Sequence, residues 1–265
     1  MTRSPNDPIS VLAIAAHRDD VEQTCGGTLL KMAERGHRTA ILDLTRGEMG
    51  TRGTAADRAR EAAESARFLR VAWRGALDIP DARVENSWEN RLKVAAVIRM
   101  LQPRVVILPY EKGRHPDHYT ASKLGYEACF LAGLKKLDLS KAGIDIEPAI
   151  GDKSQITRSQ ITNSPPHRPF KIIYASLYYE VRPTFVVDIT EQFDRRVEAL
   201  LAYRSQYEDQ AAGAGLFPTH KEIRDRVETM ARFYGLLVGV RYGEPFVQNE
   251  VGLVDDLTAL PVQSL

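Results

Sequence analysis

Two apolar runs, each followed by a cluster of polar side chains, constrain the fold of this chain more than any other feature. Residues 10–16 read SVLAIAA and residues 104–110 read RVVILPY, without alternation of apolar and polar positions. A strand with one face in water alternates, whereas a strand covered on both faces is apolar throughout. Both runs therefore predict buried strands of a parallel sheet.

Strand and helix patterns alternate through the first half of the chain. Helical spacing in TLLKMAERG ends at Gly36, and residues 90–103 end at Pro103, which are both helix stop signals. Alternation with short connections predicts an α/β fold, namely a Rossmann-like, doubly wound, mostly parallel sheet with helices on both faces. The predicted elements are strands at 10–16, 37–45, within 70–80 and at 104–110, and helices at 28–36, 57–70, 90–103 and about 119–135.

The last part of the chain is less regular. The pattern of strands and helices loosens over residues 138–169, where GDKSQITRSQITNSPPHRPF, beginning at Gly151, is rich in Ser, Thr, Pro and Asn, which predicts an exposed loop. Beyond it we expect strands at 171–179 and 184–189, then amphipathic helices at 191–207 and 221–239. Without an internal repeat or a separating linker, the sequence predicts one domain, 1–265, with a decorated C-terminal third.

Composition limits the classes of partner. The chain has 36 Lys and Arg against 35 Asp and Glu, so its charge gives no reason to expect nucleic acid or an anionic membrane. The apolar run near the N-terminus is too short for a signal peptide, and none approaches the ~20 residues of a membrane span. Cys25 and Cys129 belong to no CxxC pair, which favours a reduced, cytoplasmic protein.

The two polar clusters are HRDD at 17–20 and HPDH at 115–118. In a doubly wound sheet, ligands bind beyond the carboxyl ends of the strands, so both clusters can meet at one edge. Three His or Asp ligands with one open position form a catalytic zinc site. A further carboxylate can take a proton from water, and a further histidine can stabilise an oxyanion.

Simpler interpretations exist for each feature. Adjacent Asp residues before a helix are often N-caps, and HPDH alone is typical of a solvated turn. The Gly26–Gly27 pair fits neither a dinucleotide-binding nor a P-loop pattern, so close helix packing is favoured. Cys25 is better explained as a small buried residue than as a ligand. Only the two polar clusters together favour a site.

Three arginines follow strands and are candidates for binding substrate. Arg46, Arg52 and Arg114 lie in loops after predicted strands. An arginine there can bind a carboxylate or hydroxyl of a ligand, although simple surface exposure explains each position equally well.

The motifs resemble those of a known family. AHRDDVEQTCGGTL at 16–29 resembles the AHPDDxExxxGGTL signature of the PIG-L/LmbE-like deacetylases, and GRHPDH at 113–118 resembles their HxDH signature. The resemblance continues through DLTRGEMGTRGT and VVILPY. The C-terminal third is similar to the bacterial branch that deacetylates N-acetylglucosaminyl-malate in bacillithiol synthesis. Most of the chain is covered, and 138–169 is covered least.

The resemblance implies a ligand set that spacing alone leaves open. It implies zinc bound by His17, Asp20 and His118, with Asp19 as the general base. Two histidines and one carboxylate also suit Fe(II).

The resemblance also implies roles for the remaining polar residues. His115 would stabilise the oxyanion or act as an acid, Asp117 would orient His115, and Arg52 would bind substrate. Arg18 stands where the family usually has proline. We expect its side chain to point away from the metal, because a nearby cation would weaken metal binding.

The expected function is hydrolysis of the N-acetyl group of a small amino-sugar conjugate, with N-acetylglucosaminyl-malate as the favoured substrate. Tyr- and Phe-rich C-terminal segments predict a homo-oligomer, and the resemblance suggests a hexamer. The alternatives are a deacetylase of another N-acetylglucosaminide or amide, and a non-catalytic sugar-binding protein of the same fold. A two-metal phosphoesterase would need more ligands than these motifs supply.

Overall fold

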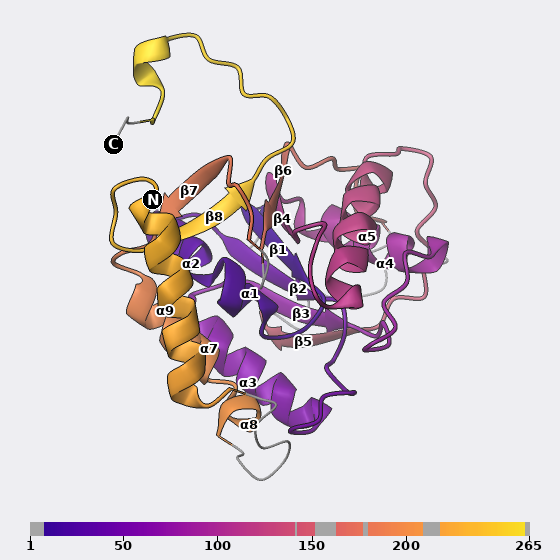
Figure 1. Ribbon diagram of the computed structural model, residues 1–265. Helices are drawn as coiled ribbons and strands as arrows, with labels where there is room; N and C mark the ends of the chain where they lie inside the picture. Colours follow the sequence, from indigo (N-terminus) through magenta and orange to yellow (C-terminus); the bar gives the residue numbers. More distant parts are fainter. Residues whose placement is uncertain (1–7, 141, 152–162, 177–179, 209–217, 263–265) are drawn as a thin grey trace.

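The computed structural model describes residues 8–140, 142–151, 163–176, 180–208 and 218–262. Its centre is one eight-stranded sheet with the order β5-β3-β2-β1-β4-β6-β8-β7 (Figure 1). The strands are β1 Val11–Ala15, β2 Thr39–Asp43, β3 Trp73–Leu77, β4 Val105–Pro109, β5 Ile146–Ile150, β6 Lys171–Ala175, β7 Phe185–Asp188 and β8 Gly243–Val247.

The strand order brings the two polar clusters together. Strands β3, β2, β1, β4 and β6 are parallel, whereas β5 runs antiparallel to β3 and β8 antiparallel to both its neighbours. The chain passes from β1 outward to β3 and then returns to place β4 on the other side of β1. Val11 pairs with Val105, so β1 and β4 end side by side. Residues 17–20 and 115–118, which follow these strands, therefore share one edge.

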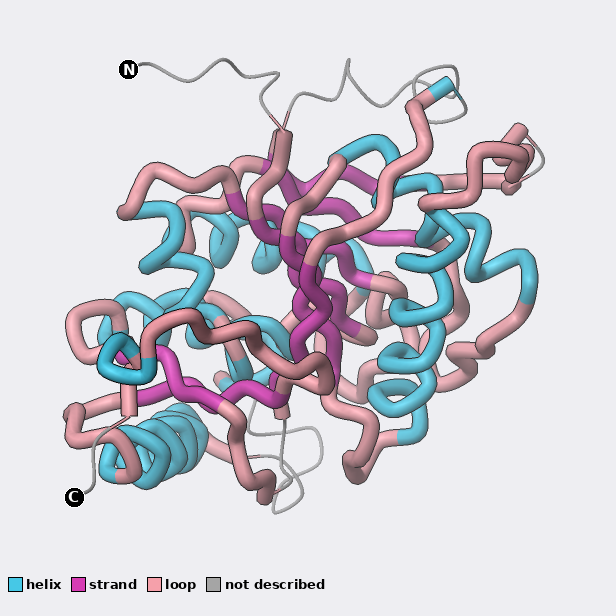
Figure 2. The backbone as a smooth tube through the Cα atoms, turned by 90° about the horizontal axis from the view of Figure 1, so that it is seen from above, coloured by secondary structure: helices cyan, strands magenta, loops and turns pink. Residues whose placement is uncertain are grey.

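Helices cover both faces of the sheet (Figure 2). Leu12 and Ile14 of β1 pack with α4 and α5 on one face, while Ala13 and Ala15 pack with α2 and α3 on the other, as alternation along a strand requires. The helices are α1 Asp20–Thr24, α2 Gly26–Glu34, α3 Ala55–Phe68, α4 Trp88–Leu101, α5 Pro116–Ala132, α7 Phe193–Leu201, α8 Arg204–Tyr207 and α9 His220–Leu236. None of these described helices is long and apolar enough to span a membrane.

Most predicted elements are found with boundaries shifted by a few residues, but the loop predicted at 138–169 is wrong in part. Residues Ile146–Ile150 form the edge strand β5, which pairs with β3. An edge strand is half-exposed and tolerates Pro148, so it lacks the apolar run that marked β1 and β4. Residues 152–162 of that segment, and 177–179 of the predicted strand 171–179, lie outside the described residues.

Two other differences concern short elements. The predicted helix 191–207 is divided into α7 and α8 at residues 202–203. Strand β8, which sits between β6 and β7, is not predicted from the sequence and carries only five residues including Pro245. Short, Pro-containing strands have weak patterns, and their place in a sheet is decided by packing.

Candidate active site

Three side chains meet where β1 and β4 end. His17 follows β1, Asp20 begins α1, and His118 lies in the first turn of α5. Nδ1 of His17 is 3.2 Å from Nε2 of His118, and the Asp20 carboxylate lies 3.4 Å from His17 Nδ1 and 3.2 Å from His118 Nε2. Ligand atoms at tetrahedral positions around zinc are about 3.3 Å apart. The donor set and its spacing therefore fit one metal ion.

A second group of carboxylates surrounds His17. Its Nε2 atom is 3.1 Å from Asp81 Oδ1 and 3.4 Å from Asp117 Oδ2. Burial alone would lower the pKa of His17, but Asp20, Asp117 and Asp81 together raise it to about 12. This excess of negative charge attracts a cation. The carboxylates on Nε2 leave Nδ1 directed at Asp20 and His118, as in sites where outer carboxylates orient a ligating histidine.

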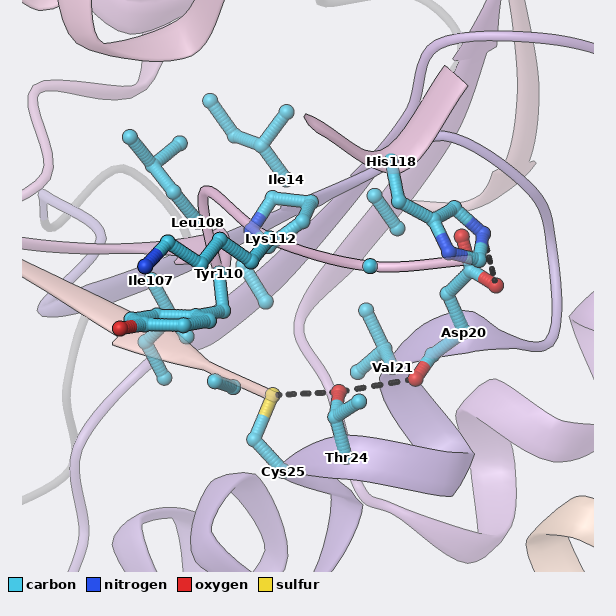
Figure 3. A pocket seen from close by; sticks show the side chains of 15 residues that line it. Ile14, Asp20, Val21, Thr24, Cys25, Ile107, Leu108, Tyr110, Lys112 and His118 are labelled. Atoms are coloured by element: carbon cyan, nitrogen blue, oxygen red, sulfur yellow. Dashed lines mark hydrogen bonds and ion pairs between the residues drawn. The ribbon is translucent and has the colours of Figure 1, made fainter. Parts of the chain in front are cut away.

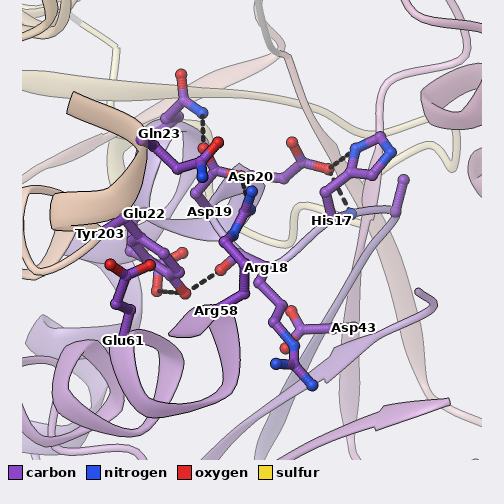
Figure 4. Close-up of polar contacts among 12 residues, drawn as sticks. His17, Arg18, Asp19, Asp20, Glu22, Gln23, Asp43, Arg58, Glu61 and Tyr203 are labelled. Atoms are coloured by element: carbon purple, nitrogen blue, oxygen red, sulfur yellow. Dashed lines mark hydrogen bonds and ion pairs between the residues drawn. The ribbon is translucent and has the colours of Figure 1, made fainter. Parts of the chain in front are cut away.

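Asp19 lies beside the cluster but outside it. Two groups of the described residues could hold a metal ion: one is His17, Asp20 and His118, the other is His17, His115 and Asp117, and Asp19 belongs to neither. The Asp19 carboxylate accepts hydrogen bonds from Arg58 at 2.9 Å and from Gln23 at 3.2 Å (Figure 4). It accepts a third from the Tyr207 hydroxyl at 3.2 Å. These donors come from α3, α8 and α1, so three helices fix this carboxylate next to the cluster.

His115 is the N-cap of α5, and its Nδ1 accepts the backbone N–H of Asp117 at 3.2 Å. Its ring centre lies 4.7 Å from that of His17. Burial lowers the pKa of His115, and the neighbouring His17 and His118 lower it further. The carboxylate of Asp117, expected to orient His115, instead contacts His17 and accepts the N–H of Val84 at 3.3 Å.

A polar cleft of about 500 Å³ opens over the cluster. Of the three candidate arginines, Arg114 lines this cleft. The other two do not line it: Arg52 donates to the Gln206 carbonyl at 2.8 Å, and Arg46 pairs with Asp145 at 2.7 Å. The described lining residues include His17, Asp19, Asp20, Gln23, Arg58, Asp81, Arg114, His115, His118, Tyr207 and Arg226.

Sequence reasoning missed Asp81, Arg58 and Tyr207. Asp81 follows β3 by four residues, so the strand-end rule that found the other clusters could have found it. Arg58 is one of many charged residues on α3, and the sequence does not tell which of them faces inward. In the folded protein Arg58 is 4% exposed and forms an ion pair with Asp19 at 2.9 Å. Tyr207 lies in a helix of four residues without periodic signal.

A smaller pocket lies behind two of the candidate ligands (Figure 3). It is mainly apolar, borders Asp20 and His118, and has a volume of about 20 Å³, which is room for about one water molecule. The Cys25 thiol lines it, 3.7 Å from the Thr24 hydroxyl, and burial raises the pKa of this thiol. Cys25 belongs to neither candidate metal group of the described residues, in agreement with its expected packing role.

Arg18 points away from the metal cluster, as expected. It is 1% exposed, its guanidinium pairs with Glu147 of β5, and it donates to the Ala55 carbonyl at 3.1 Å. The carbonyl oxygen of Arg18 accepts hydrogen bonds from Arg74 and from the Tyr203 hydroxyl. Both the guanidinium and the backbone carbonyl of Arg18 are therefore bound by other residues of the protein.

A buried network of charged residues contacts the turn formed by residues 17–20 through the Arg18 carbonyl. The Arg74 guanidinium is fully buried and donates to Asp43 at 2.9 Å and to Glu22 at 2.6 Å. Burial raises the pKa of Glu22, although Arg74 and the Ser65 hydroxyl oppose the shift. Such a network is stable only when its members remain paired. Arg74, fixed by Asp43 and Glu22, therefore restrains the turn formed by residues 17–20.

The fold and the site define a mixed α/β protein with a candidate metal centre in a polar cleft. Residues 12–129 match the family described as PIG-L: GlcNAc-PI de-N-acetylase. The chain is 30% identical over 253 residues to diacetylchitobiose deacetylase of Thermococcus kodakarensis, covering 90% of this chain and 82% of the relative.

Two solved structures are similar. One is the conserved protein TT1542 of Thermus thermophilus, at 37% identity and a TM-score of 0.74, over 93% of this chain and 98% of that one. The other is N,N'-diacetylchitobiose deacetylase of Pyrococcus horikoshii, at 28% identity and a TM-score of 0.72, over 91% and 83%. The chain belongs to the PIG-L family of deacetylases.

Proposed function

We propose that this chain is a metal-dependent hydrolase that removes the acetyl group from a small N-acetylglucosaminide. The observation that carries the proposal is the meeting of three side chains beside a separately held carboxylate, Asp19. His17 Nδ1 lies 3.2 Å from His118 Nε2, and the two Asp20 oxygens lie 3.4 Å and 3.2 Å from these two nitrogens. His17, Asp20 and His118 would hold the ion. Zn²⁺ suits this donor set, and Fe²⁺ suits it as well. A bound ion lowers the pKa of water and polarises the amide carbonyl.

Asp19 accepts a proton from the attacking water. Its contacts with Arg58 and Tyr207 fix one position for the carboxylate, as a proton acceptor in this reaction requires. Water adds to the amide carbon, the bond from that carbon to nitrogen breaks, and the proton passes to the nitrogen. The products are acetate and a free amine.

His115 donates a hydrogen bond to the oxyanion or a proton to the leaving nitrogen. Burial and the neighbouring His17 and His118 lower its pKa, which favours the neutral imidazole and therefore the first role, a hydrogen bond to the oxyanion, over proton donation. Because Nδ1 accepts the Asp117 amide, the neutral ring carries its hydrogen on Nε2, the atom available to the cleft. The Asp117 carboxylate then acts on His17 rather than on His115.

N-acetylglucosaminyl-malate is the substrate we favour, as in bacillithiol synthesis. Arg114 and Arg226 line the cleft and offer guanidinium groups to the two carboxylates of a malate aglycone. Diacetylchitobiose is the second candidate, and the 30% identity to an enzyme named for it supports that choice. The two candidates differ in charge, so they are easily separated.

An amine-release assay with metal-loaded enzyme tests the proposal. The panel contains N-acetylglucosaminyl-malate, its inositol analogue, diacetylchitobiose and longer chito-oligosaccharides, with Asp19→Asn as the inactive control. We expect the malate conjugate to have the highest kcat/KM. Preference for diacetylchitobiose would reject the malate assignment and keep the deacetylase, whereas no amine from any member would reject the deacetylase itself.

We also propose a cytoplasmic homo-oligomer. Both cysteines are free and buried, which suits a reducing compartment. Exposed apolar side chains on the C-terminal third, including Phe233 and Leu236, supply surface for assembly.

A further inference from the structure

A second group of side chains in the site has the composition of a metal centre. His17, His115 and Asp117 each offer one ligand atom, and these atoms all lie within 4.8 Å of one another. Two ligands at about 2.1 Å from one zinc ion lie at most about 4 Å apart, so the widest pair must close by less than about 1 Å. Two histidines and one carboxylate are a donor set that Zn²⁺ accepts. The group shares only His17 with the candidate metal centre described above.

The carboxylate of Asp117 gives an independent sign of a missing ligand. Its side chain is 3% exposed, and Oδ1 accepts the backbone N–H of Val84 at 3.3 Å. Oδ2 is buried and forms no hydrogen bond with any described residue, although Nε2 of His17 lies 3.4 Å away. A buried carboxylate oxygen without a hydrogen bond is unfavourable, because nothing compensates its lost hydration. A cation beside Oδ2 would supply the missing partner.

Asp81 contacts the same nitrogen of His17 but has its hydrogen bonds. Its Oδ1 accepts the N–H of Ala82 at 2.8 Å, and its Oδ2 accepts the N–H of Met49 at 3.0 Å. Asp81 also belongs to neither group of described residues that could hold a metal ion. The two carboxylates beside His17 Nε2 therefore differ in the property that a second ion needs, which is an oxygen without a backbone donor.

The charge around His17 favours a second cation. The carboxylates of Asp20, Asp81 and Asp117 lie within 3.4 Å of its ring nitrogens. Together they carry three negative charges, so one divalent ion at the first centre leaves one of these charges uncompensated. His17 and His115 also line the polar cleft, so an ion can reach this group from solvent.

We propose that His17, His115 and Asp117 form a second, weaker zinc site, and that an ion in this site inhibits the enzyme. The inference rests on the proposed function, because the second ion lies beside the catalytic one. His17 then bridges the two ions through Nδ1 and Nε2, and the hydrogen of Nε2 leaves to solvent as a proton. Since the ions share one imidazole and repel each other, the second binds more weakly than the first.

Inhibition follows from the role of His115. We assign this side chain to the oxyanion, and a second ion disturbs that role whichever nitrogen binds it. Bound through Nε2, the ring has no hydrogen to donate. Bound through Nδ1, it loses the hydrogen bond from the Asp117 amide, at 3.2 Å, that holds it in place. Removing one oxyanion donor typically lowers kcat by about 10²–10³-fold, so we expect at least tenfold inhibition.

Equilibrium dialysis against Zn²⁺ tests the second site without any substrate. Untagged, full-length protein is dialysed over a range of free zinc concentrations, and bound metal is measured by elemental analysis. We expect two steps of one ion per chain in the parent protein. In Asp117→Asn the midpoint of the second step should rise at least 100-fold. His115→Asn should behave in the same way, while its amide can still cap α5.

Asp81→Asn is the matched control, because it removes a carboxylate from the same nitrogen of His17. We expect it to keep the second step within tenfold of the parent midpoint. A single step in the parent protein, or a second step that is equal in all three variants, would overturn the second site. If no ion binds in either step, the metal centre of the proposed function is rejected as well, so the two failures are distinguishable.

Amine release at the same zinc concentrations tests the inhibition. We expect turnover to rise with the first step and to fall at least tenfold with the second, in the parent protein and in Asp81→Asn. Turnover that stays constant while the second ion binds would contradict an inhibitory role for this site.

Discussion

The buried guanidinium of Arg18 forms an ion pair with Glu147, which lies 129 residues further along the chain on the edge strand β5. Arg18 stands between a candidate metal ligand, His17, and the candidate base, Asp19. Its carbonyl is held by Arg74 and Tyr203. Where the family usually restricts this turn with a proline ring, this chain restricts it with side-chain contacts on both sides of the residue.

Breaking this pair should weaken the turn. In Glu147→Gln the Arg18 guanidinium keeps only a neutral partner, and we expect a loss of roughly 1–3 kcal/mol in the free energy of unfolding, since Glu147 is partly exposed. Metal affinity should fall with it. Urea unfolding and metal titration measure both effects. Asp145→Asn is the control, because it breaks the exposed pair with Arg46 two residues away. Equal effects in both variants would show that the Arg18–Glu147 ion pair does not stabilise the turn.

Replacing the candidate base should separate chemistry from metal binding. Asp19→Asn keeps the shape of the side chain and its contact with Tyr207, but it cannot accept the proton. We expect kcat to fall by about 10²–10⁴-fold while the metal content stays near one ion per chain. Steady-state kinetics and elemental analysis measure these quantities. Asp194→Asn, on an exposed side chain, should change neither. Near-normal turnover in Asp19→Asn would mean that another group takes the proton.

Asp81 should tune metal affinity without touching the ion. Its carboxylate contacts His17 Nε2 at 3.1 Å, on the side of the ring opposite Nδ1. Removing such an outer partner typically weakens metal binding 10–100-fold, and we expect Asp81→Asn to lie within that range. Competition with a chelator gives the dissociation constant. If affinity is unchanged, Asp117 alone is sufficient to orient the ring.

Arg114 should distinguish the two candidate substrates. Its guanidinium lines the cleft, where it can bind a carboxylate of the malate aglycone. We expect Arg114→Met to raise KM for N-acetylglucosaminyl-malate by about tenfold, the equivalent of one charge-assisted hydrogen bond, and to leave KM for diacetylchitobiose within twofold. An equal rise in KM for both substrates would show that Arg114 does not bind the carboxylates of the aglycone.

The buried cysteines should resist alkylation. Burial raises the pKa of the Cys129 thiol to about 12 and raises that of Cys25 further, so the reactive thiolate is scarce at pH 8. We expect native protein to react with a thiol reagent far more slowly than free cysteine, and both residues to react at once in urea. Since the raised pKa lies above the ordinary value near 9, reactivity should rise only at strongly alkaline pH. Rapid labelling of native protein at pH 8 would contradict the burial.

The sequence predicted those parts of the site that belong to a single local pattern. The apolar runs of β1 and β4 and the polar clusters after them lie within short segments, so strand ends and candidate ligands could be found together. The contacts of Arg46 and Arg52 could not be predicted in this way. Both follow strands, yet Asp145 and the Gln206 carbonyl, which bind them, lie some 99 and 154 residues away. No local pattern records such pairings.

The same limit explains the missing edge strand. Ile146–Ile150 is half-exposed and contains Pro148, so its composition is that of a loop. It forms a strand because its backbone pairs with the edge of β3 and because Glu147 forms an ion pair with the buried Arg18. Both reasons are tertiary, and neither is visible until β3 and the turn after β1 have been placed.

The residues that contact Asp19 come from two parts of the sequence, the segment that matches the family model and the C-terminal third. All three candidate ligands lie between residues 17 and 118, inside the segment that matches the family model, whereas Tyr207 contacts Asp19 from outside that segment. Mutations in the C-terminal third can therefore change the surroundings of the candidate base while the candidate metal ligands stay constant. Selection can then alter reactivity and substrate range in this lineage without first changing the candidate metal centre.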